Sequence, residues 1–114
     1  MNQLSIRPSP SSEFALRFPS FVLFSEAYLH QDWDIAFDSP EEALVAFGRN
    51  HPDARASLSD AANALLREQS TEADRYEVLA SIGWNFWGPA GRLDALLTWA
   101  RETMAQRSVH NSTG

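Results

Sequence analysis

The protein is a chain of 114 residues with a formal net charge of −6 and no cysteine. The missing thiols exclude disulfides and thiolate metal sites, and the acidic balance argues against nucleic acid as a partner because its phosphates would be repelled. No apolar run is long enough for a membrane span or a secretory leader, so we expect a cytoplasmic protein that forms a single domain over residues 1–114.

Residues 1–12 are polar and rich in proline and serine, which is typical of a flexible arm, and we expect the polar tail 108–114 to be flexible as well. The first helix is predicted to begin at Pro19, because proline is favoured at the first helical position, and to run to Leu29. This segment is apolar around most of its circumference, which predicts a central helix with neighbours on several sides.

A second helix is predicted to open at Ser39 as the N-cap, with Pro40 at the first helical position and Gly48 as the stop. Glu42 stands three residues after Ser39 and completes a capping-box pattern, which stabilises a helix by about 1 kcal/mol. The inward-facing positions of this helix are Ala43, Leu44 and Phe47.

Three further helices are predicted: one after His51-Pro52, one from Ser70 or Thr71 to Gly83, and one from about Arg92 to Arg107. Their core positions recur every three or four residues and are, in order, Leu58, Ala61, Ala62, Leu65 and Leu66; Ala73, Tyr76, Leu79, Ala80 and Ile82; and Leu93, Leu96, Leu97, Ala100 and Met104. No segment alternates well enough for a strand, and the nearest is Trp33–Phe37. The sequence therefore predicts an all-α bundle of about five helices.

Most of the negative charge is gathered in one part of the sequence. Between Phe18 and Gly48 there is no Lys or Arg, while the acidic residues there are Glu26, Asp32, Asp34, Asp38, Glu41 and Glu42. Runs of charge are usually solvated faces, but this concentration without cations fits a binding surface equally well, and both interpretations stay open.

His30, Asp32 and Asp34 are residue types that bind divalent metals, yet their spacing is short and no second histidine lies in register. His30 is better explained as a side chain whose positive charge would favour a helix C-terminus. Asp32 and Asp34 as a catalytic pair would need contrasting environments, and no phosphate loop or nucleophile motif is present. The sequence therefore predicts no enzyme, no metal and no cofactor.

Two aromatic features have both a structural and a functional interpretation. Trp33 is favoured as a core residue that fills the gap between the first two helices, rather than as an interface anchor, and Asp32 is expected to cap local backbone N–H groups. The segment 84–91 holds three aromatic residues within four positions. Because three rings are too many for the interior, we expect Trp87 to be at least half exposed, where it marks a possible partner site.

The run Tyr28-Leu29-His30-Gln31-Asp32-Trp33-Asp34, followed by Pro40-Glu41-Glu42-Ala43 at the start of an amphipathic helix, resembles the helical CdiI immunity proteins of contact-dependent growth inhibition systems. The similarity covers about residues 18–100, and its specific part is the Tyr-x-His-Gln-Asp-Trp motif. Leu29 replaces the aromatic residue more often expected there and keeps the position apolar.

This resemblance implies a cytoplasmic protein, monomeric before complex formation, that binds the C-terminal toxin domain of its own system's CdiA protein and blocks it stoichiometrically. Such toxins are commonly nucleases with a basic surface, which an acidic immunity surface would meet rapidly. The expected contact residues are Asp34, Asp38, Glu41 and Glu42, with Trp87 as a further candidate. A motif shared by proteins that neutralise different toxins belongs to the scaffold, and this role is assigned to Tyr28, His30, Gln31, Asp32 and Trp33.

An alternative function is a small helical adaptor or regulatory subunit that docks a partner helix in an apolar groove. The gene neighbourhood distinguishes the two functions, because a gene directly downstream of a very large exported protein supports immunity.

Overall fold

The computed structural model describes residues 10–105 of the chain and the side chains from residue 13 onward. The regular structure in this range is entirely helical. The helices are α1 (Pro10–Arg17), α2 (Pro19–Tyr28), α3 (Trp33–Ala36), α4 (Pro40–Asn50), the 3-10 turn η2 (Pro52–Ala54), α5 (Arg55–Glu68), α6 (Glu72–Ala80) and α7 (Arg92–Ala105). None of them is long and apolar enough to cross a membrane.

The all-α fold class is confirmed, but the predicted number of helices is too small, since residues 10–105 form seven α-helices. The first extra helix, α1, starts at Pro10, inside the arm predicted to be flexible; the rest of that arm and the tail 108–114 lie outside the described residues. A non-helical residue, Phe18 (φ −131°, ψ 63°), separates α1 from α2, because the residue before a proline avoids the helical region. The second extra helix, α3, is a single turn within the segment nearest to a strand pattern.

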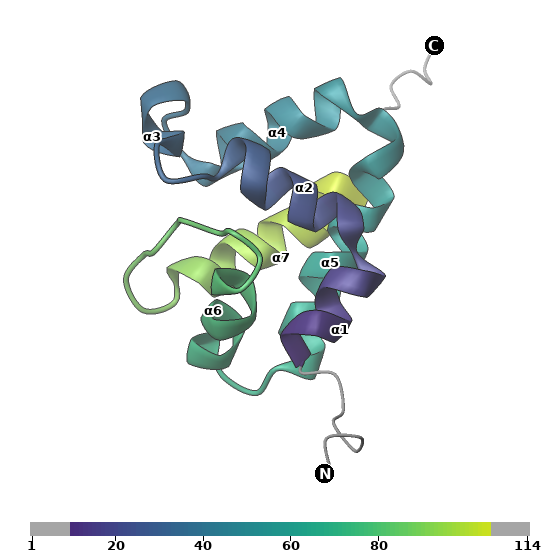
Figure 1. Ribbon diagram of the computed structural model, residues 1–114, viewed down its shortest axis with the longest axis vertical. Coiled ribbons are helices and arrows are strands. Elements are labelled where there is room, and N and C mark those ends of the chain that lie inside the picture. The colour runs from purple at the N-terminus through teal and green to yellow at the C-terminus, as the bar shows by residue number, and fades with distance from the viewer. Residues whose placement is uncertain (1–9, 106–114) are drawn as a thin grey trace, which may run out of the picture.

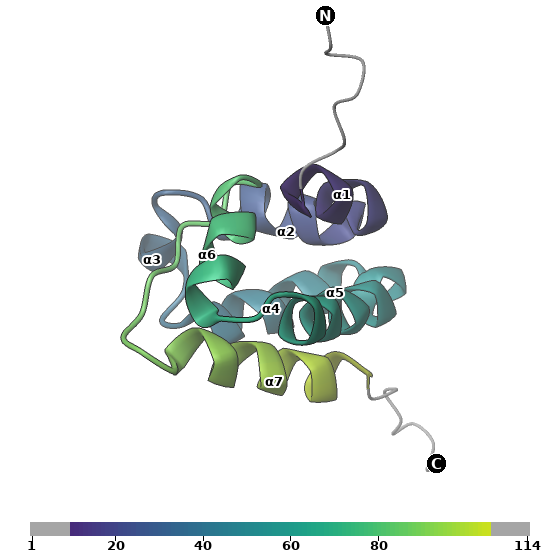
Figure 2. The ribbon, with the colours of Figure 1, turned by 90° about the horizontal axis from the view of Figure 1, so that it is seen from below.

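The longer helices form three layers, which are clearest in Figure 2. Helices α1 and α2 form one outer layer, α4 and α5 lie in the middle, and α7 forms the opposite layer. Helix α6 crosses the side of this stack and contacts both α1 and α7. The loop after α6 then returns to the start of α7 at the same end of the molecule as α3 (Figures 1 and 2).

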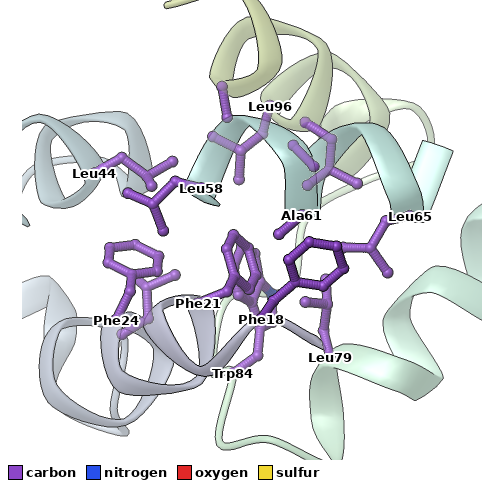
Figure 3. Close-up of a cluster of buried hydrophobic side chains, with 14 of the residues drawn as sticks. Phe18, Phe21, Phe24, Leu44, Leu58, Ala61, Leu65, Leu79, Trp84 and Leu96 are labelled. Carbon is purple, nitrogen blue, oxygen red and sulfur yellow. The ribbon is translucent and has the colours of Figure 1, made fainter. Parts of the chain in front are cut away.

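The core lies between these layers and is rich in aromatic rings (Figure 3). Phe21 and Phe24 of α2 are fully buried, and Trp84 stacks on Phe21 with a ring-centroid distance of 5.8 Å. The opposite outer side of α2 is open, with Leu23 48% exposed. The prediction of a central α2 is therefore wrong: the helix covers the core from one side, and its apolar outer residues are not all needed for packing.

Helix α4 begins as predicted, with the Ser39 hydroxyl accepting a hydrogen bond from the Glu42 N–H (3.1 Å). It does not stop at Gly48 but continues to Asn50. Gly48 is buried, and a Cβ atom there would lie 3.2 Å from Nη1 of Arg55. The glycine is thus explained by a close approach between α4 and the start of α5 rather than by a helix end.

Helix α6 is shorter than predicted, and its predicted core positions are confirmed at Leu79 and Ile82 but wrong at Ala73 and Ala80. It ends at Ala80, and the chain reaches Gly83 (φ 94°) through turns. Ala73 and Ala80 are exposed and Tyr76 is only partly buried. The buried positions in and just after this helix, spaced three and four residues apart, are Arg75, Val78, Leu79 and Ile82. A buried arginine occupies the first position of this stripe, which an apolar pattern cannot reveal.

The start of α7 is held by polar contacts from α6. The Glu72 carboxylate accepts hydrogen bonds from the N–H groups of Gly91 (2.9 Å) and Asp94 (3.1 Å) and so caps a helix 19 residues further along the chain. Arg75 forms a bidentate pair with Asp94 at 2.8 and 2.9 Å and also donates to three carbonyl groups near the end of α5. These contacts fix the place where the aromatic loop 84–88 meets α7.

Candidate functional site

Tyr28, the first residue of the sequence motif, joins α2 to α4. Its ring stacks on Phe37 at 5.8 Å and meets the edge of Phe47 at 5.1 Å. Its hydroxyl accepts a hydrogen bond from Nδ2 of Asn50 (2.7 Å). Tyr28 and Phe37 therefore fill the space between these two helices, so the prediction that Trp33 fills it is wrong.

The middle of the motif forms the exposed turn that leads into α3. Nδ1 of His30 accepts a hydrogen bond from the Asp32 N–H (3.1 Å), and the His30 carbonyl accepts one from Trp33 (2.9 Å). The imidazole of His30 thus supports the turn that leads into α3, and its expected role as a helix-end cation stays a prediction. Asp32 stands at the N-cap of α3, but its side chain makes no capping bond, so the prediction that it caps local N–H groups is wrong. Gln31 is exposed in the same turn.

Trp33 connects α3 to the aromatic loop. Its Nε1 donates to the carbonyl of Asn85 (3.0 Å), and its ring meets the edge of Phe86 at 5.8 Å. The side chain is partly buried and packs against the border of the core. Trp33 therefore attaches α3 to a loop more than fifty residues away, rather than filling the gap between α2 and α4.

The loop itself divides its three aromatic rings between interior and surface. Trp84 is 2% exposed, and its Nε1 donates to the Phe86 carbonyl (2.7 Å). Phe86 is partly buried and lies beneath the guanidinium of Arg92, 5.3 Å from the ring centroid. Trp87 is 55% exposed and rests against Tyr76, so the prediction that this ring is at least half exposed is confirmed.

The four carboxylates predicted to contact a partner, Asp34, Asp38, Glu41 and Glu42, form what we call the acidic face. They lie on α3, on the connection after it and on the first turn of α4. Asp34 and Asp38 are exposed, and within residues 10–105 their carboxylates have no ion-pair partner.

The two glutamates of the acidic face already have partners inside the protein. Both oxygens of Glu41 accept hydrogen bonds from Arg92, each at 2.7 Å, and this guanidinium lowers the pKa of Glu41 below its ordinary value. Oε1 of Glu42 accepts from the Asp38 N–H (3.0 Å), one residue before the position that a capping box would use. The expectation of an uncompensated acidic block is thus wrong at Glu41, because its counter-ion comes from α7.

The acidic face combines two solvated carboxylates, those of Asp34 and Asp38, with two that are held by partners inside the protein. In the part of the chain that the structure describes, no group of three His, Asp or Glu side chains is placed to hold a metal ion. What the surface offers is negative charge around an apolar residue, Ile35, that is 83% exposed on α3.

Sequence reasoning missed the cations that organise this end of the molecule. Arg92 contacts both Glu41 and Phe86, and therefore links the acidic face to the aromatic loop. Arg75 and Glu72 hold the helix that carries Arg92. No local pattern marks the ion pairs, because Asp94 is 19 positions from Arg75 and Glu41 is 51 positions from Arg92.

A comparison with known protein families identifies a match that covers most of the chain. The family described as CdiI immunity protein matches residues 17–96, which include the motif, the acidic face, the aromatic loop and the first turn of α7. No curated protein and no solved structure matches the chain.

Proposed function

The chain belongs to the CdiI immunity protein family, whose members neutralise toxins, and we propose that it binds the C-terminal toxin domain of its own system's CdiA protein through the acidic face. The inhibition is stoichiometric and involves no turnover. The toxin domain is a basic protein, and a nuclease is the class whose substrate demands such a surface.

The observation that carries this proposal is the exposed, unpaired condition of the Asp34 and Asp38 carboxylates. Both are exposed and have no ion-pair partner in the described residues, and they flank the exposed Ile35 on α3. Opposite charges steer two proteins together and raise the association rate, and an apolar residue among them adds contact area once they meet. Glu41 supports the surface indirectly, because its pair with Arg92 fixes the first turn of α4 against α7.

The test is the kinetics of binding to the purified toxin domain of the neighbouring CdiA protein. The variant Asp34→Asn/Asp38→Asn removes two charges without touching a hydrogen bond of either carboxylate. Glu41 stays unchanged, since its replacement would break the Arg92 pair and mix stability with binding. We expect association to slow roughly ten-fold at low salt, and the difference to shrink at high salt.

The matched control is Asp60→Asn/Asp74→Asn, which removes the same charge from exposed positions on α5 and α6. Its association rate should change by no more than about two-fold, because only charges near the contact steer strongly. Equal slowing of both variants would mean that net charge, and not the acidic face, drives association. No slowing in either would refute the acidic-face mechanism.

A further inference from the structure

A groove of about 440 Å³ runs along the outer side of α4, next to the acidic face. Its lining includes Phe37, Glu41, Glu42, Val45, Ala46 and Arg49. Helix α4 lies along the upper edge of the molecule in Figure 1. Ser39, the N-cap of α4, also lines the groove, which therefore extends to the start of this helix.

The α4 residues of this groove form one stripe. Glu42, Val45, Ala46 and Arg49 are spaced three, four and seven residues from the first, which places them on one side of a helix. At 1.5 Å per residue, the stripe is about 10 Å long, or two helical turns. Along it the surface changes from acidic, through apolar, to basic.

The apolar character in the middle of the stripe is not explained by the needs of the core. Glu42 and Arg49 complement the dipole of α4 at its two ends, so their charges have a local reason. Val45, however, is 37% exposed in a helix whose other side already supplies the core residues Ala43, Leu44 and Phe47. Beside it, the partly buried ring of Phe37 extends the apolar surface.

We propose that this groove receives a segment of the toxin domain that carries a cation at one end, apolar side chains in the middle and a carboxylate at the other end. The cation lies beside Glu42 and the exposed Asp38, the apolar part covers Val45, Ala46 and Phe37, and the carboxylate pairs with Arg49. Charge complementarity at both ends gives the segment a single direction in the groove. This proposal rests on the proposed function and adds to it the position and chemistry of the contact.

We assign the bound segment to the same toxin domain because the groove and the acidic face are continuous. Glu41 and Glu42 belong to both, and Asp38 donates its backbone N–H to Glu42. The stem of a lysine or arginine covers apolar surface while its head stays beside a carboxylate, so a basic surface suits this groove better than a purely apolar one.

The decisive variant is Val45→Glu, measured for its dissociation constant with the same toxin domain. An added carboxylate tightens binding if the partner only senses the overall negative charge. It weakens binding if Val45 is covered by apolar atoms, because the new carboxylate must then be desolvated and, four residues before Arg49, it competes with the carboxylate of the segment for that cation. We expect affinity to fall by at least ten-fold, together with loss of protection in cells that express the toxin.

Two further variants complete the design. Leu16→Glu makes the same kind of change at a residue on α1 that is 79% exposed, and it should bind within about two-fold of the parent. Val45→Gln keeps the site neutral and should show an intermediate loss. Circular dichroism melts verify that each variant is folded, which is expected because Glu and Gln are good helix formers.

If Val45→Glu bound the toxin domain as tightly as the parent or more tightly, the groove proposal would be wrong and the proposed function would remain. If instead the parent protein itself neither bound the toxin domain nor protected cells, the proposed function would fail, and the groove with it.

Discussion

Arg75 offers the sharpest test of what holds the site in place. This residue is 9% exposed and its guanidinium makes five hydrogen bonds, two to Asp94 of α7 and one each to the carbonyls of Leu65, Leu66 and Gln69. Replacement by Met keeps most of the side-chain volume and removes all five donors. The change therefore isolates the polar contacts from the packing.

The magnitude follows from what each partner loses. Breaking a buried ion pair by removing one partner costs about 3–5 kcal/mol. The side chain of Asp94 is 39% exposed and regains water, which puts the expected loss at the lower end of that range. We therefore expect Arg75→Met to lower the free energy of unfolding by about 3 kcal/mol, and Tm by roughly 12 °C for a chain of this size.

The assay is urea unfolding followed by circular dichroism, with Arg67→Met as the matched control. Arg67 is an exposed arginine on α5, and its replacement should change the free energy of unfolding by less than about 0.5 kcal/mol. Arg75→Lys keeps the charge but loses the forked geometry, and should lie between parent and Arg75→Met. A loss below about 1 kcal/mol for Arg75→Met would refute the view that this residue holds α5, α6 and α7 together.

Two further predictions concern stability. Trp33→Ala should lower the free energy of unfolding by about 2–4 kcal/mol in urea unfolding, which is less than the loss for a fully buried tryptophan. Because Trp33 holds the loop through Asn85, protease should also cleave the loop around Trp87 in this variant faster than the whole protein unfolds. Arg17, Arg92 and backbone N–H groups lower the pKa values of Glu68, Glu41 and Glu72, respectively, in the folded state. The stability that these carboxylates contribute is therefore fully present above the unfolded pKa of about 4.3 and is lost as the pH falls through the lower folded pKa. The free energy of unfolding should be level from pH 7 to about 5.5 and should fall below about pH 4.5. The fall should be shallower in Glu41→Gln.

The helices with strong local signals could be predicted from the sequence. The Pro19 start of α2, the Ser39 cap of α4 and the periodic apolar residues of α5 and α7 each depend on residues within a few positions of one another. Helix α1 also begins at a proline, but it has only eight residues in a polar segment and is stabilised by the packing of Phe14 on Phe18 and Phe21. Short helices depend on tertiary contacts of this kind.

The candidate site could be predicted only in part for the same reason. The exposure of Trp87 followed from the crowding of three rings in four residues. The pairing of Glu41 with Arg92 did not follow from any local pattern, because the two residues are 51 positions apart. The position of Trp33 was missed likewise, since its partners Asn85 and Phe86 are brought to α3 only by the folded loop.

The unequal exposure of the tryptophans gives the protein its own optical probes. Trp84 is shielded in the core, whereas Trp87 is open to solvent in the loop after α6, and this loop lies at the same end of the molecule as α3 (Figure 1). The other two of the four tryptophans, Trp33 and Trp99, are partly buried, so quenching by acrylamide should reach Trp87 most readily and Trp84 least. A partner that covers this end would shift and protect the accessible component while leaving the core signal constant, and unfolding would change both.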